Sequence, residues 1–346
     1  MTLLDGERIL RSFNASDPWF ADMDTRTILK ILTFYARFTP DYTKIGYYLR
    51  KLGWPETPPL DFSGQNWLVT GASSGLGKAM MKAAAEAGAT VVGVSSNQSK
   101  LNAAVAEIDE SARNFVTTMV ADLSLQSGTE KILSELLEGG HKFDVLQNNA
   151  GILFNELSVT SEGRETTYAV NVMSHYILTK GLVEGGAFNE NAAIVNMTSG
   201  GMYNAPLSAE GLNNTNPETF NGKMSYAFAK RAQVALTDYW NDIYGEKRIS
   251  FYVTHPGWTK TPGVKEALPT FWVIQNPILR EPLQGCDTAL WLCATRPQIQ
   301  QDIVWFDRKE RPTHMFDFTK SPQCTIEELV EYFEEDVGRS VADVGS

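Results

Sequence analysis

The sequence predicts an α/β protein with one doubly wound parallel sheet of about seven strands and helical extensions at both ends. Two observations support this fold class. Short runs rich in β-branched residues alternate with longer helical segments through the middle of the chain, which is the pattern of a parallel sheet with crossover helices. A glycine-rich turn also joins the first of these runs to a helix, as it does in nucleotide-binding sheets.

Each predicted element follows from its residue pattern. Strands are short apolar runs that end at turn residues, and we expect them at residues 66–71, 90–95, 114–120, 143–148, 192–198, 249–254 and 302–306. Helices are longer and have a period near 3.6, and we expect them at 76–88, from about 99, and near 162–185 and 225–245. No second alternating unit follows the last strand, which favours one large domain.

Two extensions flank this domain. We divide the chain into a helical N-terminal extension at 1–60, the domain at 61–320, and an acidic C-terminal helix with a tail at 321–346. The N-terminal extension contains a basic amphipathic helix at 26–38, a short helix after Pro40 and a proline-rich linker at 54–59. The basic helix fits two interpretations: peripheral membrane contact through 26–52, or docking on the domain or on a partner subunit in a homodimer.

Composition and charge exclude several function classes. The 346 residues include 30 basic and 41 acidic side chains, and the net charge of −11 argues against nucleic-acid binding. Cys286, Cys293 and Cys324 are odd in number and lack CxxC spacing, so we expect reduced thiols in a cytoplasmic protein. The four histidines are scattered and predict no metal site. The sequence has no signal-peptide pattern and no apolar run of about 18 residues.

The turn after the first strand is a candidate phosphate-binding site. It reads Thr70-Gly71-Ala72-Ser73-Ser74-Gly75-Leu76-Gly77 and opens the next predicted helix. Glycines let the backbone approach a pyrophosphate closely, and the helix N-terminus offers unpaired N–H groups. A glycine-rich turn alone is a weak signal, but here strand, turn and helix stand in the required order.

Further polar clusters follow the other predicted strands. They are Asp122-Leu123 after the third strand, Asn149-Ala150-Gly151 after the fourth, Ser199 after the fifth and Pro256-Gly257 after the sixth. Ligands of open α/β sheets bind at the carboxyl ends of the strands, so we expect these clusters along one edge of the sheet. Tyr226 and Lys230 stand four residues apart at the start of a long predicted helix.

Together these motifs resemble the short-chain dehydrogenase/reductase superfamily, which has a Rossmann-type fold. The matching pieces are 70–77, 148–151, Asn171, Ser199, Tyr226-x-x-x-Lys230 and 256–257, and the resemblance spans about residues 62–310. Other stretches are similar to one subgroup, the dehydrogenase/reductase SDR family member twelve-like proteins: 42–47, 199–202, 226–227 with 230–231, 255–258, 261–264 and 307–309. That subgroup brings no well-defined substrate.

The resemblance implies an NAD(P)-dependent oxidoreductase. It implies that Asn171 supports a water relay to Lys230. It also implies a cofactor site at the strand ends, made of Gly71, Ser73, Ser74, Gly75, Leu76, Gly77, Ser96, Asp122, Leu123, Asn149, Ala150, Gly151, Tyr226, Lys230, Pro256, Gly257, Trp258, Thr259 and Thr261.

Tyr226, Lys230 and Ser199 have the chemistry that such a reaction needs. A carbonyl that receives a hydride requires a proton donor within hydrogen-bond reach of its oxygen, and Tyr226 is the candidate. A free tyrosine has a pKa of about 10. Lys230 lies one helical turn on, and its charge, with that of an oxidised nicotinamide, is expected to lower the pKa of Tyr226. Ser199 can hydrogen-bond the substrate oxygen and hold it in line.

Each of these residues also has an ordinary structural interpretation. A tyrosine and a lysine four apart are common on amphipathic helices, and a serine after a strand usually makes a turn. Asp122 could cap the following helix, and Asn171 could be a polar residue inside a helix. The joint order of the motifs favours the catalytic interpretation. His175 and His255 are expected to be structural or pocket-lining.

The end of the second strand indicates which nicotinamide cofactor is used. An NAD enzyme normally has a carboxylate there, but the segment reads Val94-Ser95-Ser96-Asn97, and no acid occurs between residues 86 and 107. Nothing would repel a 2′-phosphate. The arginine common at position 96 in NADP-using relatives is missing, which leaves Lys78 or Lys100 as the nearest cation. We predict NADP(H) in preference to NAD(H).

Two segments near the site bear on the substrate. The Asn-rich insert at 202–223 is expected as a loop over the site, and its length resembles the retinol-dehydrogenase-like branch. The aromatic run at 258–274 fits either a lid over an apolar pocket or a core helix packed on the sheet. We predict hydride transfer between NADP(H) and the carbonyl or alcohol group of a hydrophobic small molecule. The alternative is a weakly active nucleotide-binding or regulatory module.

Overall fold

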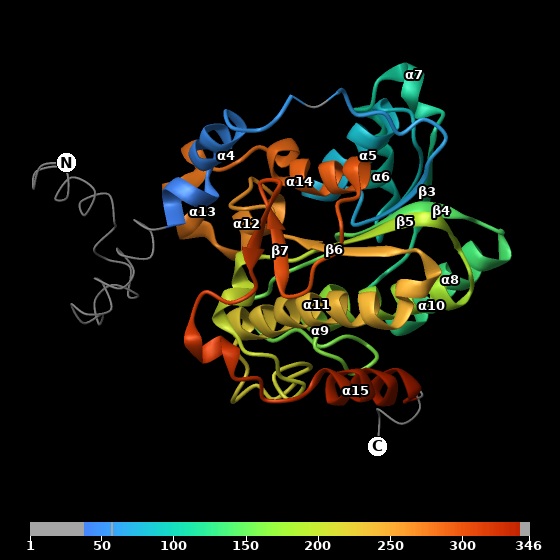
Figure 1. Cartoon of the computed structure of the whole chain (residues 1–346). Helices are drawn as coiled ribbons and strands as arrows, with labels where there is room; N and C mark the ends of the chain where they lie inside the picture. Colours follow the sequence, from blue (N-terminus) through green and yellow to red (C-terminus); the bar gives the residue numbers. More distant parts are fainter. Residues whose placement is uncertain (1–37, 57, 340–346) are drawn as a thin grey trace, which may run out of the picture.

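The computed structural model describes residues 38–56 and 58–339 and contains one eight-stranded sheet (Figure 1). The strand order is β3-β2-β1-β4-β5-β6-β7-β8. Neighbouring strands are parallel from β3 to β7, and β8 is antiparallel to β7. The strands are β1 (Asn66–Thr70), β2 (Thr90–Ser95), β3 (Val116–Val120), β4 (Phe143–Asn148), β5 (Phe188–Met197), β6 (Ser250–Thr254), β7 (Ile303–Phe306) and β8 (Lys309–Pro312). The doubly wound parallel sheet expected from the sequence is confirmed.

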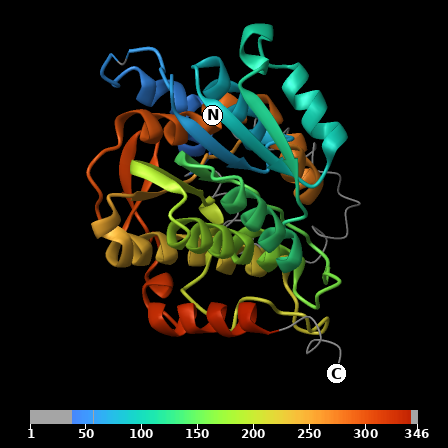
Figure 2. The same cartoon turned by 90° about the vertical axis from the view of Figure 1, so that its right-hand side faces the viewer.

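Helices cover both faces of the sheet (Figures 1 and 2). One face carries α5 (Gly75–Glu86), α6 (Gln98–Ala106), α7 (Glu110–Arg113) and α14 (Pro282–Thr295). The other face carries α8 (Gln126–Glu138), α9 (Thr166–Tyr168), a π-helix (Ala169–Met173), α10 (Ser174–Glu184) and α11 (Gly222–Tyr244). Successive strand residues point to opposite faces, so Leu68 joins one core cluster while Trp67 and Val69 join the other. Burial on both faces explains why central strands such as β1 and β2 are nearly continuous apolar runs.

The sheet has one strand more than the seven expected. β8 lacks the apolar pattern because it reads Lys309-Glu310-Arg311-Pro312 and lies at the edge of the sheet. Asp307 and Arg308 form the two-residue turn between β7 and β8, both with left-handed φ values of 49° and 58°. Positive φ at both central positions is the geometry of a type I′ hairpin, although these are not its usual residues. Strands were expected at apolar runs in the sequence, so this polar edge strand was not predicted.

The expected helix at 162–185 is shorter and interrupted. It begins at Thr166, where the fully buried Glu165 accepts hydrogen bonds from the N–H groups of Thr167 and Tyr168, both at 2.8 Å. It then widens into the π-helix at Ala169–Met173 before continuing as α10. Such π-turns are frequent at functional sites, and this one contains Asn171.

The acidic C-terminal helix α15 (Ile326–Gly338) is docked on the domain. It lies outside the α10–α11 layer, at the bottom of Figures 1 and 2. Leu329 and Phe333 are fully buried in the core beneath it, and Asp336 pairs with the buried Arg164 at 2.7 Å. Its ion-pair partners among the described residues are in the domain, not in the basic N-terminal segment.

The described part of the N-terminal extension is helical. Residues 38–42 and α4 (Lys44–Lys51) lie beside the ends of β6 and β7. Our predictions for residues 1–37, which include most of the basic helix at 26–38, and for the tail at 340–346 lie outside the described residues. Within 38–56 and 58–339, no helix is long and apolar enough to cross a membrane.

Candidate active site

The glycine-rich turn between β1 and α5 has the geometry of a phosphate cradle. Gly71 and Gly75 have φ values of +68° and +53°, a region that residues with a Cβ rarely adopt. At Gly77 a Cβ would lie only 2.2 Å from the carbonyl oxygen of Gly71. The turn thus folds back on the first turn of α5, at a helix N-terminus of the kind that binds anionic groups. Ser73 lies in the same turn, and its hydroxyl is 2.7 Å from that of Ser95 at the end of β2.

Thr70 joins this turn to the end of β4. Its Oγ1 donates to the carbonyl of Gln147 at 3.1 Å and accepts from the N–H groups of Asn149 and Ala150, both at 3.0 Å. The Asn149 amide in turn donates to the Thr70 carbonyl at 3.0 Å. Asn149 and Ala150 are therefore fixed against Gly71. Thr70 is the first residue of the motif at 70–77, and the sequence alone did not indicate this contact with the end of β4.

The loop after β6 closes the other side of the turn. A Cβ on Gly75 would lie 3.2 Å from the Thr261 side chain, which also caps α12 (Pro262–Ala267) by accepting from Val264 N–H at 3.2 Å. Thr259 donates to the carbonyl of Pro256 at 3.0 Å, and a Cβ on Gly285 would contact both Thr259 and Leu76. The predicted cofactor residues after β1, β4 and β6 are thus brought together.

Ser199, Tyr226 and Lys230 also converge. The Nζ atom of Lys230 lies 5.6 Å from the centroid of the Tyr226 ring and donates to the carbonyl of Met197 at 2.9 Å. The Tyr226 hydroxyl hydrogen-bonds Ser199, whose Oγ accepts from Gly201 N–H at 3.2 Å. The Tyr226 ring packs on Gly201, where a Cβ would lie 3.2 Å from two ring carbons. Gly201 therefore lets the ring approach Ser199.

Asn171 lies beside Lys230, and both ends of its side-chain amide are hydrogen-bonded to the backbone. Its Oδ1 accepts from Ile152 N–H at 3.0 Å, and its Nδ2 donates to the carbonyls of Ile152 and Thr167 at 2.7 and 2.8 Å. A Cβ on Gly151 would lie 2.7 Å from Asn171 Oδ1 and 3.4 Å from Lys230 Nζ. The Asn171 side chain thus holds the backbone that follows β4 next to Lys230.

The main-chain oxygen of Asn171 is hydrogen-bonded as well. The buried Gln233 donates its Nε2 to this oxygen at 2.7 Å and contacts Nδ1 of His175 at 2.8 Å. Gln233 stands on the same face of α11 as Lys230 and Tyr226, at helical spacing, although no motif in the sequence contains it.

Burial sets the electrostatics of the pair formed by Tyr226 and Lys230. Burial raises the pKa of Tyr226 above its ordinary value, and the hydrogen bond with Ser199 only partly opposes this. Burial also lowers the pKa of Lys230 to about 7. In the protein by itself, desolvation is the larger influence on the pKa of Tyr226, and the expectation that Lys230 and an oxidised nicotinamide together lower this pKa stays a prediction.

Both histidines near the site are buried and neutral. Burial lowers the pKa values of His175 and His255 to about 3. His255 accepts from Gly257 N–H at 3.2 Å and stacks on Phe306 with a centroid distance of 4.1 Å. Neither is placed to act as a base at neutral pH, in agreement with the structural interpretation.

Three predicted cofactor residues at the ends of β2 and β3 are placed less directly. Ser96 is exposed beyond the end of β2, and Leu123 is buried in the core. Asp122 is exposed and accepts from the N–H and the hydroxyl of Ser124, at 3.0 and 2.7 Å. It does not cap α8, because Glu162 accepts the hydrogen bond from Gln126 N–H at the start of that helix.

The segment after the β6 loop lies on the surface. α12 is followed by α13 (Pro269–Gln275), where Val273 and Ile274 are 76% and 43% exposed. Phe271 meets Trp258 edge to face at 5.0 Å. The core-helix interpretation of this aromatic run is therefore wrong.

The first part of the insert at 202–223 is packed on the domain, whereas residues 215–219 are exposed. It begins in a short 3-10 helix (Gly200–Asn204), and the buried Arg231 of α11 donates to the carbonyls of Met202 and Ala205 at 2.7 and 3.1 Å. Its Leu207 carbonyl accepts from Gln323 N–H at 2.8 Å. These contacts hold the insert against α11 and the C-terminal segment.

Comparison with known proteins identifies the family. Residues 65–270 match the short chain dehydrogenase family. The chain is 34% identical over 311 residues to dehydrogenase/reductase SDR family member 12 of Bos taurus, covering 87% of this chain and 96% of that protein. The chain belongs to the short-chain dehydrogenase/reductase family. The superfamily and subgroup that the motifs indicated are both confirmed, and the chain is an NAD(P)-dependent oxidoreductase of this family.

Other relatives and solved structures agree on the fold. The human member 12 is 34% identical over 314 residues, covering 89% of this chain and 98% of that protein. Retinol dehydrogenase 12 of Bos taurus is 26% identical, covering 64% and 71% of the two chains. An angucycline C-6 ketoreductase solved with bound NADP superposes with a TM-score of 0.55 at 22% identity, covering 68% of this chain and 90% of that one.

The residues present fit a nicotinamide cofactor. The family implies one, and the cradle at Gly71, Gly75 and Gly77 is space that side chains would fill. The other predicted contacts, at Asn149–Gly151 and Pro256–Thr261, border the same turn.

Proposed function

We propose that this protein transfers a hydride between NADP(H) and the carbonyl or alcohol group of a hydrophobic small molecule, with Tyr226 as general acid and base. The observation that carries the proposal is the convergence of Ser199, Tyr226 and Lys230 beside Gly151, next to the glycine-rich turn. A nicotinamide cofactor supplies the hydride donor or acceptor when it is bound.

Four side chains carry out proton transfer, substrate orientation, charge stabilisation and backbone positioning in the proposed reaction. Tyr226 delivers its hydroxyl proton to the substrate oxygen during reduction and takes it back during alcohol oxidation. Ser199 hydrogen-bonds the same oxygen and orients it toward Tyr226. Lys230, fixed by the Met197 carbonyl, stabilises negative charge that develops on the Tyr226 oxygen. Asn171 holds the backbone at Gly151 and Ile152 in place beside Lys230, and we propose that it also supports a water relay to Lys230.

A direct test compares wild type with Tyr226→Phe. A panel of aliphatic and aromatic aldehydes, ketones and alcohols is assayed by NADPH absorbance, while cofactor binding is measured separately by titration. We expect turnover of apolar substrates by wild type, and a loss of about 10² to 10⁴ in rate with cofactor binding retained in Tyr226→Phe. Unchanged turnover in Tyr226→Phe would refute the role of this tyrosine.

The preference for NADP(H) rests on the end of β2. Ser95, Ser96 and Asn97 stand where an NAD enzyme has a carboxylate, so no negative charge opposes a 2′-phosphate. Lys78 is the nearer of the two predicted cations to the turn, but both Glu107 oxygens lie 2.8 Å from its Nζ; Lys100 is exposed. Titration with NADPH and NADH tests the proposal, and NADH binding at least tenfold tighter would overturn it.

One observation favours the alternative of a weakly active nucleotide-binding or regulatory module. Burial raises the pKa of Tyr226 and lowers that of Lys230, which opposes formation of the phenolate. The intact set of Ser199, Tyr226 and Lys230 favours the enzyme. A wild-type protein that binds NADPH tightly but turns over no member of the substrate panel would support the alternative.

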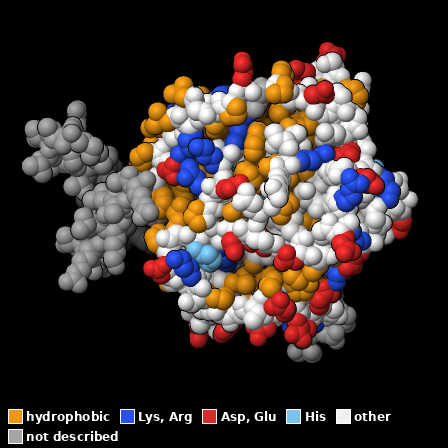
Figure 3. Space-filling view, in the orientation of Figure 1, with side chains coloured by type: hydrophobic (Ala, Val, Ile, Leu, Met, Phe, Trp, Pro, Cys, Tyr) orange, Lys and Arg blue, Asp and Glu red, His pale blue; other side chains and the backbone are white. Residues whose placement is uncertain are grey.

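We further propose that the protein is cytoplasmic and contacts membranes peripherally through residues 26–52. All three cysteines lie in the described part of the chain and are unpaired there. On α4, Ile45, Tyr48 and Leu49 are 44–64% exposed, next to Lys44 and Lys51. Figure 3 shows orange side chains with blue ones beside them over α4 and α13. Lack of binding to anionic vesicles would refute the membrane proposal. Light scattering tests the alternative, in which this segment contacts a second copy of the chain in a homodimer.

A further inference from the structure

The described N-terminal segment reaches the candidate active site. The carbonyl oxygen of Tyr42 accepts two hydrogen bonds from residues more than 200 positions later, one from Trp258 N–H at 2.8 Å and one from Arg280 Nε at 2.9 Å. Trp258 belongs to the loop after β6 that borders the glycine-rich turn. The backbone of the N-terminal segment therefore completes the hydrogen bonding of that loop.

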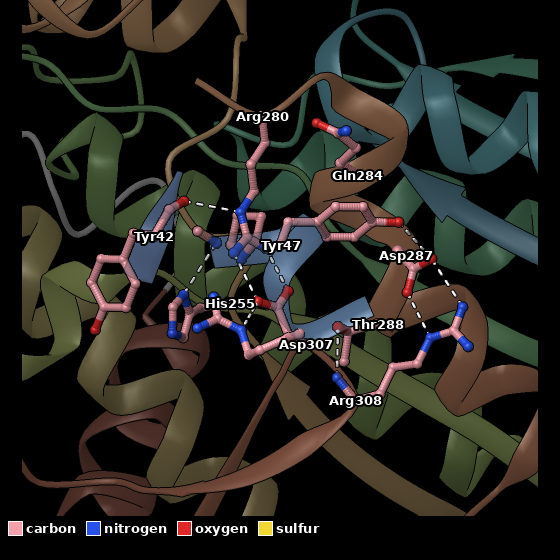
Figure 4. Close-up of polar contacts among 12 residues, drawn as sticks. Tyr42, Tyr47, His255, Arg280, Gln284, Asp287, Thr288, Asp307 and Arg308 are labelled. Atoms are coloured by element: carbon pink, nitrogen blue, oxygen red, sulfur yellow. Dashed lines mark hydrogen bonds and ion pairs between the residues drawn. The ribbon is translucent and has the colours of Figure 1, made fainter. Parts of the chain in front are cut away.

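Arg280 also forms hydrogen bonds with the backbone of this loop. Its main-chain N–H donates to the carbonyl of Trp258, and its own carbonyl accepts from Lys260 N–H, both at 2.8 Å. Its guanidinium is fully buried and forms a two-pronged ion pair with the equally buried Asp307, at 2.6 and 2.8 Å. Figure 4 shows Arg280 between the Tyr42 carbonyl and Asp307. A planar guanidinium suits this role because its donors have a fixed geometry.

Gly257 lies so close to Arg280 and Tyr42 that no side chain would fit at this position. It has a φ of +69°, and a Cβ there would lie 2.7 Å from both Arg280 Nε and the Tyr42 carbonyl oxygen. The Tyr42 ring adds an edge-to-face contact with Trp258 at 5.8 Å and with His255 at 5.1 Å. Gly257 and Trp258 are thus packed against Tyr42 and Arg280.

Ion pairs anchor the N-terminal segment in turn. Arg50 of α4 donates its Nε to Asp307 at 2.6 Å and also binds the carboxylate and carbonyl of Asp41. A second anchor joins α4 to α14, because the Tyr47 hydroxyl donates to Asp287 at 3.2 Å. Asp307 therefore forms ion pairs with two arginines: Arg280, which positions the loop, and Arg50, which positions the N-terminal segment.

We propose that residues 38–51 are a positioning element of the active site, which orders the Pro256–Thr259 loop for cofactor binding through Tyr42, Arg50 and the Arg280–Asp307 pair. The proposal rests on the proposed function in assigning that loop to the cofactor. These residues do not touch the reacting atoms, so their effect is on cofactor affinity and on the order of the loop. It gives the N-terminal extension a role that the family motifs do not contain.

The test uses Arg50→Met in the full chain, because Arg50 is near the surface and its removal leaves Arg280 paired with Asp307. The matched control is Arg248→Met, which removes an arginine in a single ion pair with Glu190 far from the loop. Hydrogen exchange of residues 256–261 is measured without cofactor. The Kd for NADPH is measured by titration, well below the thermal midpoint of each variant.

For Arg50→Met we expect faster exchange at 256–261 and a Kd for NADPH raised about fivefold or more, with both unchanged in Arg248→Met. Arg280→Lys, which keeps the charge but cannot bind Asp307 and Tyr42 together, should give larger changes of the same sign. A merely structural role would lower the thermal midpoint without changing the Kd.

Two results would overturn the proposal: unchanged exchange at 256–261 in Arg50→Met, or faster exchange with an unchanged Kd. Failure of the proposed function looks different, since wild type would then either bind neither NADPH nor NADH, or bind NADPH and turn over no member of the substrate panel. The exchange data, taken without cofactor, would in that case still decide whether the segment orders the loop.

Discussion

Lys230 holds its ammonium 5.6 Å from the ring centroid of Tyr226 and is anchored there by the carbonyl of Met197, 2.9 Å from Nζ. The lysine is buried, and burial lowers its pKa to about 7. A cation in this position is costly for the folded protein and of most value when negative charge develops on Tyr226. This arrangement indicates that Lys230 contributes to the reaction more than to the stability of the fold.

The first prediction follows from this arrangement. Lys230→Met should reduce turnover by about 10² to 10⁴ while the stability at neutral pH stays the same or rises, because an uncompensated buried charge is removed. A matched control lies just beyond the end of this helix, in the 3-10 helix Gly245–Lys247. Lys247 lies 5.8 Å from the ring of Tyr244, and Lys247→Met should leave turnover unchanged. Equal losses of turnover in Lys230→Met and Lys247→Met would refute a specific catalytic role of Lys230.

Acid should destabilise the protein through its buried histidines. The pKa values of His175 and His255 are about 3 in the folded state, against an ordinary value of 6.5. Between pH 6.5 and 3 the unfolded chain therefore binds protons that the folded chain does not. Stability is fully present above pH 6.5 and falls as the pH drops, by up to about 1.4 kcal/mol per unit for each histidine.

Urea unfolding at pH 7.5 and pH 5 measures this loss. His175→Gln and His255→Gln should each flatten the pH dependence of the free energy of unfolding. His141→Gln, at a half-exposed histidine just before β4, is the control and should leave it unchanged. A pH dependence that survives in both buried variants would mean that other groups cause the acid loss.

Thr70 supplies the third prediction. Thr70→Val keeps the shape but removes the acceptor of the Asn149 and Ala150 N–H groups. Leaving buried donors unpaired costs about 1–3 kcal/mol each, and the strand end beside Gly71 should loosen. We expect a lower free energy of unfolding and weaker NADPH binding, with Thr70→Ser close to wild type. Thr129→Val, which removes one hydroxyl contact inside α8, controls for loss of a buried hydroxyl.

The sequence was sufficient for the features that depend on local pattern. Strands such as β1 and β4 are buried on both faces and must be apolar throughout, so their runs were recognisable. The turn at Gly71 and Gly77 was recognisable because only glycine fits positions with a positive φ or with no room for a Cβ. Ser199, Tyr226 and Lys230 were recognisable from their order along the chain.

Features that depend on distant contacts could not be predicted. The Tyr42 carbonyl and Arg280 are 238 positions apart, and a backbone acceptor leaves no mark on the sequence. Gln233 looks like any polar helix residue until its contact with the Asn171 carbonyl is seen. The burial of Tyr226, which raises the pKa of its hydroxyl, is likewise a result of packing that the sequence does not show.

The last prediction concerns cofactor choice. Lys78 is near the glycine-rich turn, yet its ammonium is paired with Glu107 at 2.8 Å, and both side chains are partly exposed. Glu107→Gln should release that charge for a 2′-phosphate and shift the ratio of NADPH to NADH affinity toward NADPH. Exposed pairs are worth about 0.2–1 kcal/mol, so the shift should be less than about tenfold and should shrink with salt. Glu86→Gln, which breaks the neighbouring Lys82 pair at 2.9 Å, is the matched control. Equal ratios in the two variants would show that Lys78 does not face the phosphate.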